Sequence, residues 1–139
     1  MPVVVQIVSG SAMILFCAAI HILCAAAAIR VLRRKRPFRS GAPIRSVGLA
    51  LGALFLVFLF AHTVQIYLWA LAFLGLGALP GYEAPIYFAL VTYSTLGYGD
   101  ITLAPDFRLF GAMASVCGVL MFGLTTAFLV GAFARLLKE

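Results

Sequence analysis

Residues 95–100, Thr-Leu-Gly-Tyr-Gly-Asp, combine the residue types and spacing with the clearest chemical potential in this chain of 139 residues. A dehydrated cation needs several oxygen ligands, and backbone carbonyls supply them only where successive residues turn them the same way. Glycine permits the backbone angles that this requires, and Thr95 adds a hydroxyl oxygen at one end. One strand cannot surround an ion. The segment therefore predicts a cation site built from several copies around an axis, most simply in a closed cyclic oligomer.

Residues 84–94 (APIYFALVTYS) lead into this segment and are apolar, but they are long enough to cross only about half of a bilayer. Pro85 suits the first turn of a helix, and Glu83 lies favourably at its positive end. The glycines that follow make a poor helix interior, and irregular backbone at membrane depth is tolerated only inside protein or beside a watery cavity. The pattern predicts a re-entrant loop whose short helix directs its negative carboxyl end at a cation cavity.

The remaining sequence supplies elements that hold this loop in a membrane. Hydrophobic residues make up 65% of the chain and charged residues 10%, which excludes an ordinary soluble domain because so small a fold cannot bury that much apolar surface. Three apolar runs, 3–29, 46–79 and 109–134, are long enough to span a bilayer. The second helix is expected to end near residue 73. The first is expected to be a retained helix, because its basic cluster follows the run instead of preceding it as in a signal peptide.

The formal charge of +6 is distributed unevenly along the chain. If the three helices alternate in direction, nine of the ten basic residues lie on one side, within 30–45 and 135–138. Arg108 lies on the other side with three of the acids. The positive-inside rule then predicts a multi-pass protein of the cell membrane, with its amino terminus outside and its carboxyl terminus in the cytoplasm.

The basic loop is expected to bind anionic lipid headgroups. The candidate headgroup ligands are Arg33, Arg34, Lys35 and Arg36. Arginines at every third position are also typical of voltage-sensing helices, but such helices keep apolar residues between the arginines and lie inside the membrane. Pro37 and the position of the cluster beyond the apolar run argue against that reading. The cluster is too short and too close to the membrane to predict a nucleic-acid partner.

Two sets of polar or sulfur-bearing side chains in the apolar helices are spaced so that their members share a helix face. Cys17, His21 and Cys24 share one face of the first helix, where packing is favoured over metal binding because a structural zinc site needs four ligands and a second shell. His62 and Gln65 lie three residues apart in the second helix. We expect them to bond each other or a neighbouring helix, with proton sensing as the alternative.

The TLGYGD segment, with its half-helix before and apolar helix after, resembles the signature of potassium-channel pore domains. The likeness covers roughly residues 46–135. It implies an all-α membrane protein of three transmembrane helices plus a re-entrant pore helix and selectivity-filter loop, assembled as a tetramer. The resemblance divides the chain into two parts, which are an N-terminal helix with its basic loop (1–45) and a pore domain (46–139). By this resemblance, potassium binds backbone carbonyls of the filter. The filter residues are Thr95, Leu96, Gly97, Tyr98 and Gly99.

The same resemblance assigns further roles. Asp100 would lie at the filter mouth and Gly118 at a gating hinge, while the inner cavity would be lined by Val119, Phe122 and Thr126. The chain also departs from the pattern. Leu96 stands where valine is most common. Val91 stands where some relatives have a glutamate that pairs with the aspartate after the filter, so the filter needs another support, for which Tyr87 and Tyr93 are the candidates.

The sequence thus predicts a homotetrameric channel that passes potassium passively and selectively. It shows no nucleophile with a base, no paired carboxylates and no nucleotide-binding loop, so we expect no enzyme and no cofactor beyond the permeant ion. Two alternatives remain: a weakly selective cation channel of the same architecture, and a non-conducting regulatory membrane subunit built on the same pore domain.

Overall fold

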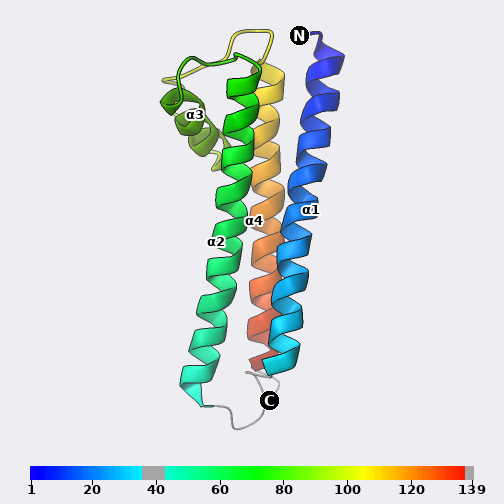
Figure 1. The fold of residues 1–139 in the computed structure, drawn as a ribbon, viewed down its shortest axis with the longest axis vertical. Helices are drawn as coiled ribbons and strands as arrows, with labels where there is room; N and C mark the ends of the chain where they lie inside the picture. Colours follow the sequence, from blue (N-terminus) through cyan, green and yellow to red (C-terminus); the bar gives the residue numbers. More distant parts are fainter. Residues whose placement is uncertain (36–42, 137–139) are drawn as a thin grey trace.

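The computed structural model describes residues 1–35 and 43–136, in which all regular secondary structure is helical (Figure 1). Three helices are long and apolar enough to cross a membrane, and one is short. The helices are α1 (Val3–Lys35), α2 (Ile44–Gly75), α3 (Glu83–Tyr93) and α4 (Arg108–Leu136). The predicted all-α membrane architecture, with one half-length helix among three spanning ones, is confirmed.

The helix boundaries differ from prediction mainly at two ends. Helix α1 continues through Arg30 to Lys35, so the start of the basic cluster is helical and not a loop, because arginine, leucine and lysine are good helix formers. Helix α2 ends at Gly75, two residues beyond the predicted end. There Gly77 adopts a positive φ of 64° while Ala78 donates to the carbonyl of Phe73, which forms a Schellman motif that closes the helix.

The long helices lie side by side, and α3 sits at one end of the bundle against α2 and α4 (Figure 1). Helix α1 packs against both α2 and α4, so it is an integral part of the bundle. The main core lies at the level of α3 and combines aromatic, sulfur-containing and small side chains. Its fully buried members include Trp69, Phe73, Tyr93, Cys17 and Cys117. A second cluster around Phe58 joins α1, α2 and α4 farther down the bundle.

The two ends of the bundle carry opposite charge. Helix α1 ends and α2 begins at the end farther from α3, and this end carries Arg30, Arg33, Arg34 and Arg45 (Figure 1). The α3 end carries Glu83, Asp100 and Asp106, together with Arg108. The alternating helix directions that the charge analysis assumed are therefore present.

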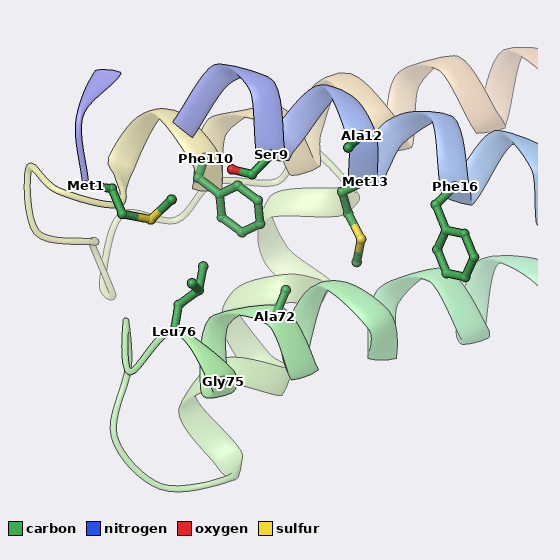
Figure 2. A pocket seen from close by; sticks show the side chains of 9 residues that line it. All are labelled: Met1, Ser9, Ala12, Met13, Phe16, Ala72, Gly75, Leu76 and Phe110. Carbon is green, nitrogen blue, oxygen red and sulfur yellow. The ribbon is translucent and has the colours of Figure 1, made fainter. Parts of the chain in front are cut away.

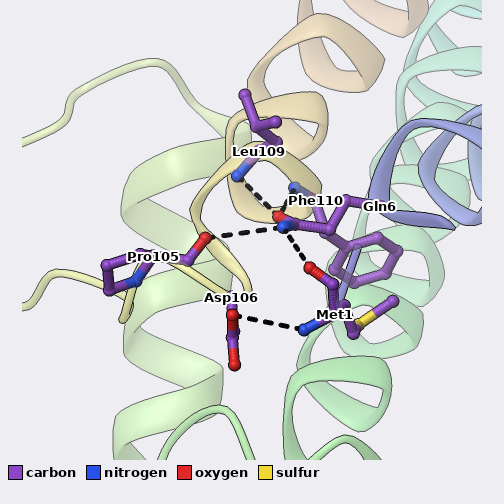
Figure 3. A network of polar contacts seen from close by, with 6 residues as sticks. All are labelled: Met1, Gln6, Pro105, Asp106, Leu109 and Phe110. Atoms are coloured by element: carbon purple, nitrogen blue, oxygen red, sulfur yellow. Dashed lines mark hydrogen bonds and ion pairs between the residues drawn. The ribbon is translucent and has the colours of Figure 1, made fainter. Parts of the chain in front are cut away.

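Gln6 joins the start of α1 to the start of α4 (Figure 3). Its side chain is 2% exposed. The Oε1 atom accepts from the backbone N–H groups of Leu109 and Phe110 at 3.0 and 3.2 Å, and Nε2 donates to the carbonyls of Met1 and Pro105 at 3.1 and 3.4 Å. The first N–H groups of a helix have no partner within the helix. Gln6 therefore caps α4 from another helix.

An apolar groove of about 560 Å³ lies near the same end, between α1 and α2 (Figure 2). The hydroxyl of Ser9, its one polar side chain, donates to the carbonyl of Val5 in its own helix. The lining residues are Met1, Ser9, Ala12, Met13, Phe16, Ala72, Gly75, Leu76 and Phe110. The groove contains no titratable side chain.

We predict that Gln6→Leu destabilises the fold, because it leaves the buried N–H of Phe110 and the part-buried N–H of Leu109 unpaired. The buried group alone costs about 1–3 kcal/mol. The measurement is the unfolding midpoint of the detergent-solubilised protein. Ser9→Ala is the control, because the Ser9 hydroxyl bonds only carbonyls of its own helix. Equal midpoints for the two variants would contradict the capping role.

Candidate functional site

The TLGYG strip, residues 95–99, begins directly at the carboxyl end of α3. The N–H of Thr95 donates to the carbonyl of Thr92 at 3.0 Å. The N–H groups of Leu96 and Gly97 both donate to the carbonyl of Val91, at 2.9 and 3.2 Å. These bonds use carbonyls that the last turn of a helix leaves without partners. The strip is thereby attached to the end of the short helix.

Alternate residues of the strip have left-handed backbone angles. The φ values are 62° at Thr95, 57° at Gly97 and 78° at Gly99. Glycine adopts such angles freely, but for threonine they cost about 1–3 kcal/mol and persist only where the surroundings impose them. Alternating handedness turns successive peptide planes the same way, which is what aligned carbonyls require. The sequence indicated this freedom for the glycines, whereas nothing in it marked Thr95.

The strip lies exposed on the surface of the single chain. Leu96 and Tyr98 are 55% and 67% exposed, whereas Tyr93, two residues before the strip, is fully buried. One face of α4 is exposed as well, and it carries Val119, Phe122 and Thr126 at helical spacing. A single chain therefore does not enclose an ion, and the assignment of ion-binding and cavity roles to these residues stays a prediction.

Tyr87 supports the end of the strip. Its hydroxyl donates to Oδ2 of Asp100 at 2.6 Å. This bond holds the pKa of the Asp100 carboxyl below its usual range and raises the pKa of the Tyr87 hydroxyl. Of the two tyrosines predicted to brace the filter, Tyr87 contacts the strip's aspartate, while the ring of Tyr93 turns into the core.

Tyr93 bonds two side chains of α2. Its hydroxyl donates to Oε1 of Gln65 at 2.5 Å and lies 3.0 Å from Nδ1 of His62. His62 and Gln65 in turn reach α4 and α1, at Thr125 and His21. The expectation that these two polar residues bond a neighbouring helix is confirmed. No feature of the sequence indicated that Tyr93 would join them.

Helix α4 crosses the end of α3 at Gly118. A Cβ atom on Gly118 would lie 1.8 Å from the carbonyl oxygen of Tyr93, so only glycine fits this contact. One turn away, the Ser115 hydroxyl donates to the carbonyl of Thr92 at 2.9 Å. The hinge role of Gly118 stays a prediction; what the structure shows is a close approach between two helices.

The predicted headgroup ligands are only partly covered by the structure. Arg33 and Arg34 are exposed at the end of α1, the backbone of Lys35 closes that helix, and Arg36 lies outside the described residues. Lipid binding here stays a prediction. Cys17 is buried and Cys24 half-buried, and within residues 1–35 and 43–136 no three histidine, cysteine or acidic side chains gather as a metal site.

Comparison with known proteins agrees with this arrangement. A family model described as "Ion channel" matches residues 53–135, which span α3, the strip and most of α2 and α4. The chain therefore belongs to this ion-channel pore-domain family. With three apolar spanning helices, it is a multi-pass membrane protein. Searches of curated proteins and of solved structures give no match.

We predict that Gly118→Ala lowers the unfolding midpoint, because the added methyl group collides with the Tyr93 carbonyl and forces α4 away from α3. Gly123→Ala is the matched control in the same helix, since a Cβ there meets nothing within 4 Å. That control is expected to be neutral or to stabilise by up to about 1 kcal/mol through helix propensity. Equal effects of the two variants would contradict the close contact.

We predict that Tyr87→Phe raises the pKa of the Asp100 carboxyl, because the bond favours the carboxylate. The Tyr87–Asp100 bond is complete above the lowered pKa and is lost as pH falls through it. Carboxyl carbon NMR titration of the protein in detergent measures the shift. Tyr82→Phe, at an exposed tyrosine that precedes α3, is the control, and an unchanged Asp100 titration in Tyr87→Phe would refute the pairing.

Proposed function

We propose that four copies of this chain form a potassium-selective channel, in which the TLGYG strips line the axis and their backbone carbonyls replace the water around the ion. Conduction is passive, down the electrochemical gradient. K⁺ is the permeant ligand and binds at Thr95–Gly99. Membership of an ion-channel family supports conduction in general. Selectivity and subunit number are the further steps of the proposal.

The observation that carries this proposal is the exposed strip with alternating left-handed residues. In a single chain the strip lies open, with Leu96 and Tyr98 exposed, so its backbone faces no other strip. A cyclic assembly supplies the missing side of the site with the same strip from other copies. Irregular backbone at membrane depth also needs protein or water around it, and the assembly provides both.

Helices α3 and α4 fit the same arrangement. The carboxyl end of α3 precedes the strip directly, so the negative end of its dipole would lie beside the entering cation. The exposed face of α4 with Val119, Phe122 and Thr126 would line the cavity below the strip. Asp100, held by Tyr87, would lie at the opposite mouth, where a carboxylate attracts cations.

The charge at the two ends supports an orientation. The arginine-rich end would face the cytoplasm by the positive-inside rule, and the strip and Asp100 would face outward. Exposed Arg33 and Arg34 would then contact anionic headgroups of the inner leaflet.

The test is rubidium or potassium flux into liposomes that contain the full chain, followed by reversal potentials in opposing potassium and sodium gradients. We expect flux and a reversal potential near the potassium equilibrium value. Gly97→Asp should abolish flux, because it places a charged side chain on the strip at a φ of 57°. Gly77→Asp is the matched control: its φ is 64° and it lies in the loop after α2, so it should conduct.

Each alternative has a distinct outcome. A reversal potential near zero in equal opposing gradients would indicate a weakly selective cation channel. A folded, assembled protein without flux would indicate a non-conducting regulatory subunit. Native mass spectrometry in mild detergent counts the copies, and a stable monomer would contradict the tetramer. Flux that is unchanged in Gly97→Asp would refute the position of the pore.

A further inference from the structure

Five side chains form a closed ring of hydrogen bonds that draws on all four helices. The ring runs from Gln65 to His21, Thr125, His62, Tyr93 and back to Gln65, with distances of 3.3, 3.1, 2.9, 3.0 and 2.5 Å. His21, Gln65 and Tyr93 are fully buried, and His62 is 9% exposed. Apolar surroundings make every unpaired donor or acceptor costly, so the way the protons are shared decides whether the ring is stable.

The amide of Gln65 fixes the direction of the ring. Its Nε2 atom donates to the backbone carbonyl of Cys17 at 3.2 Å, and a carbonyl can only accept. The same Nε2 therefore donates its second proton to Nδ1 of His21. Nδ1 of His21 is then an acceptor, so the proton of this neutral imidazole is on Nε2.

The remaining bonds follow in one direction. Nε2–H of His21 donates to the Thr125 hydroxyl, and that hydroxyl donates to Nε2 of His62. His62 is then protonated on Nδ1 and donates to Tyr93, whose hydroxyl donates to Oε1 of Gln65. Each of the five groups gives one proton and receives one. The two histidines must therefore be opposite tautomers, and both must be neutral.

A proton added to either histidine breaks this series of hydrogen bonds. On His21 it would set an N–H against the N–H of Gln65. On His62 it would require the Thr125 hydroxyl to accept from both rings and to donate elsewhere. These are the only two histidines in the chain. Histidine is the side chain whose ordinary pKa lies closest to neutrality, so the ring contains both residues of this kind.

The groups that face the ring do not offset a positive charge. His62 faces His21 of α1 and Tyr93 of α3, and it lies 4.6 Å, centroid to centroid, from Phe122 of α4. On its own helix, α2, His62 is connected to Gln65 only through the Tyr93 hydroxyl, which bonds both side chains. Beyond Tyr93 lie the thiols Cys17 of α1 and Cys117 of α4. A carboxylate is absent from these ring contacts among the described residues, so an added proton has no counter-charge there.

We propose that this ring is a positioning element for the TLGYG strip that holds only while both histidines are neutral, so that acid loosens the strip and lowers selective conduction. The inference rests on the proposed channel function. Tyr93 is the link, because its hydroxyl belongs to the ring while its backbone lies two residues before Thr95. Phe122 packs against both His62 and Tyr93 and is exposed on the proposed cavity face, so one side chain separates the ring from the water of that cavity.

The first experiment is the pH profile of flux in liposomes with the same pH on both sides. For the unmodified chain we expect flux to fall about tenfold between about pH 8 and about pH 4, because protonation has to break the ring and so requires more acid than the titration of a free histidine. A tenfold change is typical of the coupling between two sites in one protein. The double variant His21→Gln/His62→Gln should conduct at the higher pH with a nearly flat profile, because an amide supplies a donor and an acceptor but does not take up a proton in this range.

Tyr93→Phe opens the ring at every pH, so it should lower flux and the preference for potassium over sodium even at the higher pH. Tyr67→Phe is the matched control on α2: it removes a hydroxyl from a half-exposed tyrosine outside the ring and should keep the profile of the unmodified chain.

The outcomes separate the two proposals. No flux at any pH, or flux that Gly97→Asp leaves intact, would refute the channel assignment. Two outcomes would overturn the ring proposal if Gly97→Asp abolishes flux as expected. One is a flat pH profile for the unmodified chain, and the other is the same loss of flux in acid for the double glutamine variant. Imidazole ¹⁵N NMR gives a readout without conduction: at the higher pH we expect His62 protonated on Nδ1 and His21 on Nε2. Equal tautomers would overturn the assignment as well.

Discussion

The rest of the structure depends on the cost of an unpaired polar group in a membrane. Tyr93, His62 and Gln65 lie where neither water nor lipid can bond them, so each must find a protein partner. The partners are on different helices. The requirement to pair these groups therefore fixes how α1, α2 and α4 are rotated about the end of α3, and apolar packing, which is less directional, fills in around them.

The first helix is the clearest result of this constraint. The resemblance places this helix outside the pore domain, in the part formed by residues 1–45, and the matched family region begins only at residue 53. In the structure α1 completes the bundle at two levels. His21 joins the polar ring, and Gln6 caps the start of α4. Removing α1 would leave unpaired polar groups at both sites.

The sequence predicted the spanning helices, the half-length helix and the irregular strip because apolar run length, glycine and proline act locally. Helix α3 was placed to within one residue. The extension of α1 to Lys35 was missed, because the density of basic residues suggested a loop. The ring could not be predicted from spacing. His21, Tyr93 and Thr125 are far apart in the chain, and an aromatic side chain at the end of a short apolar helix is most often plain core. The left-handed backbone of Thr95 could not be predicted for a related reason, because the surrounding structure imposes it against the preference of threonine.

The contact at Gly118 has a mechanical consequence. The backbone of α4 there touches the last carbonyl of α3, with no side chain between them to absorb a displacement. A lateral movement of the inner helix at this point would therefore be transmitted to the residues that carry the strip. A displacement of α4 at Gly118 would therefore alter the geometry of the strip, and a change in the strip would in turn displace α4.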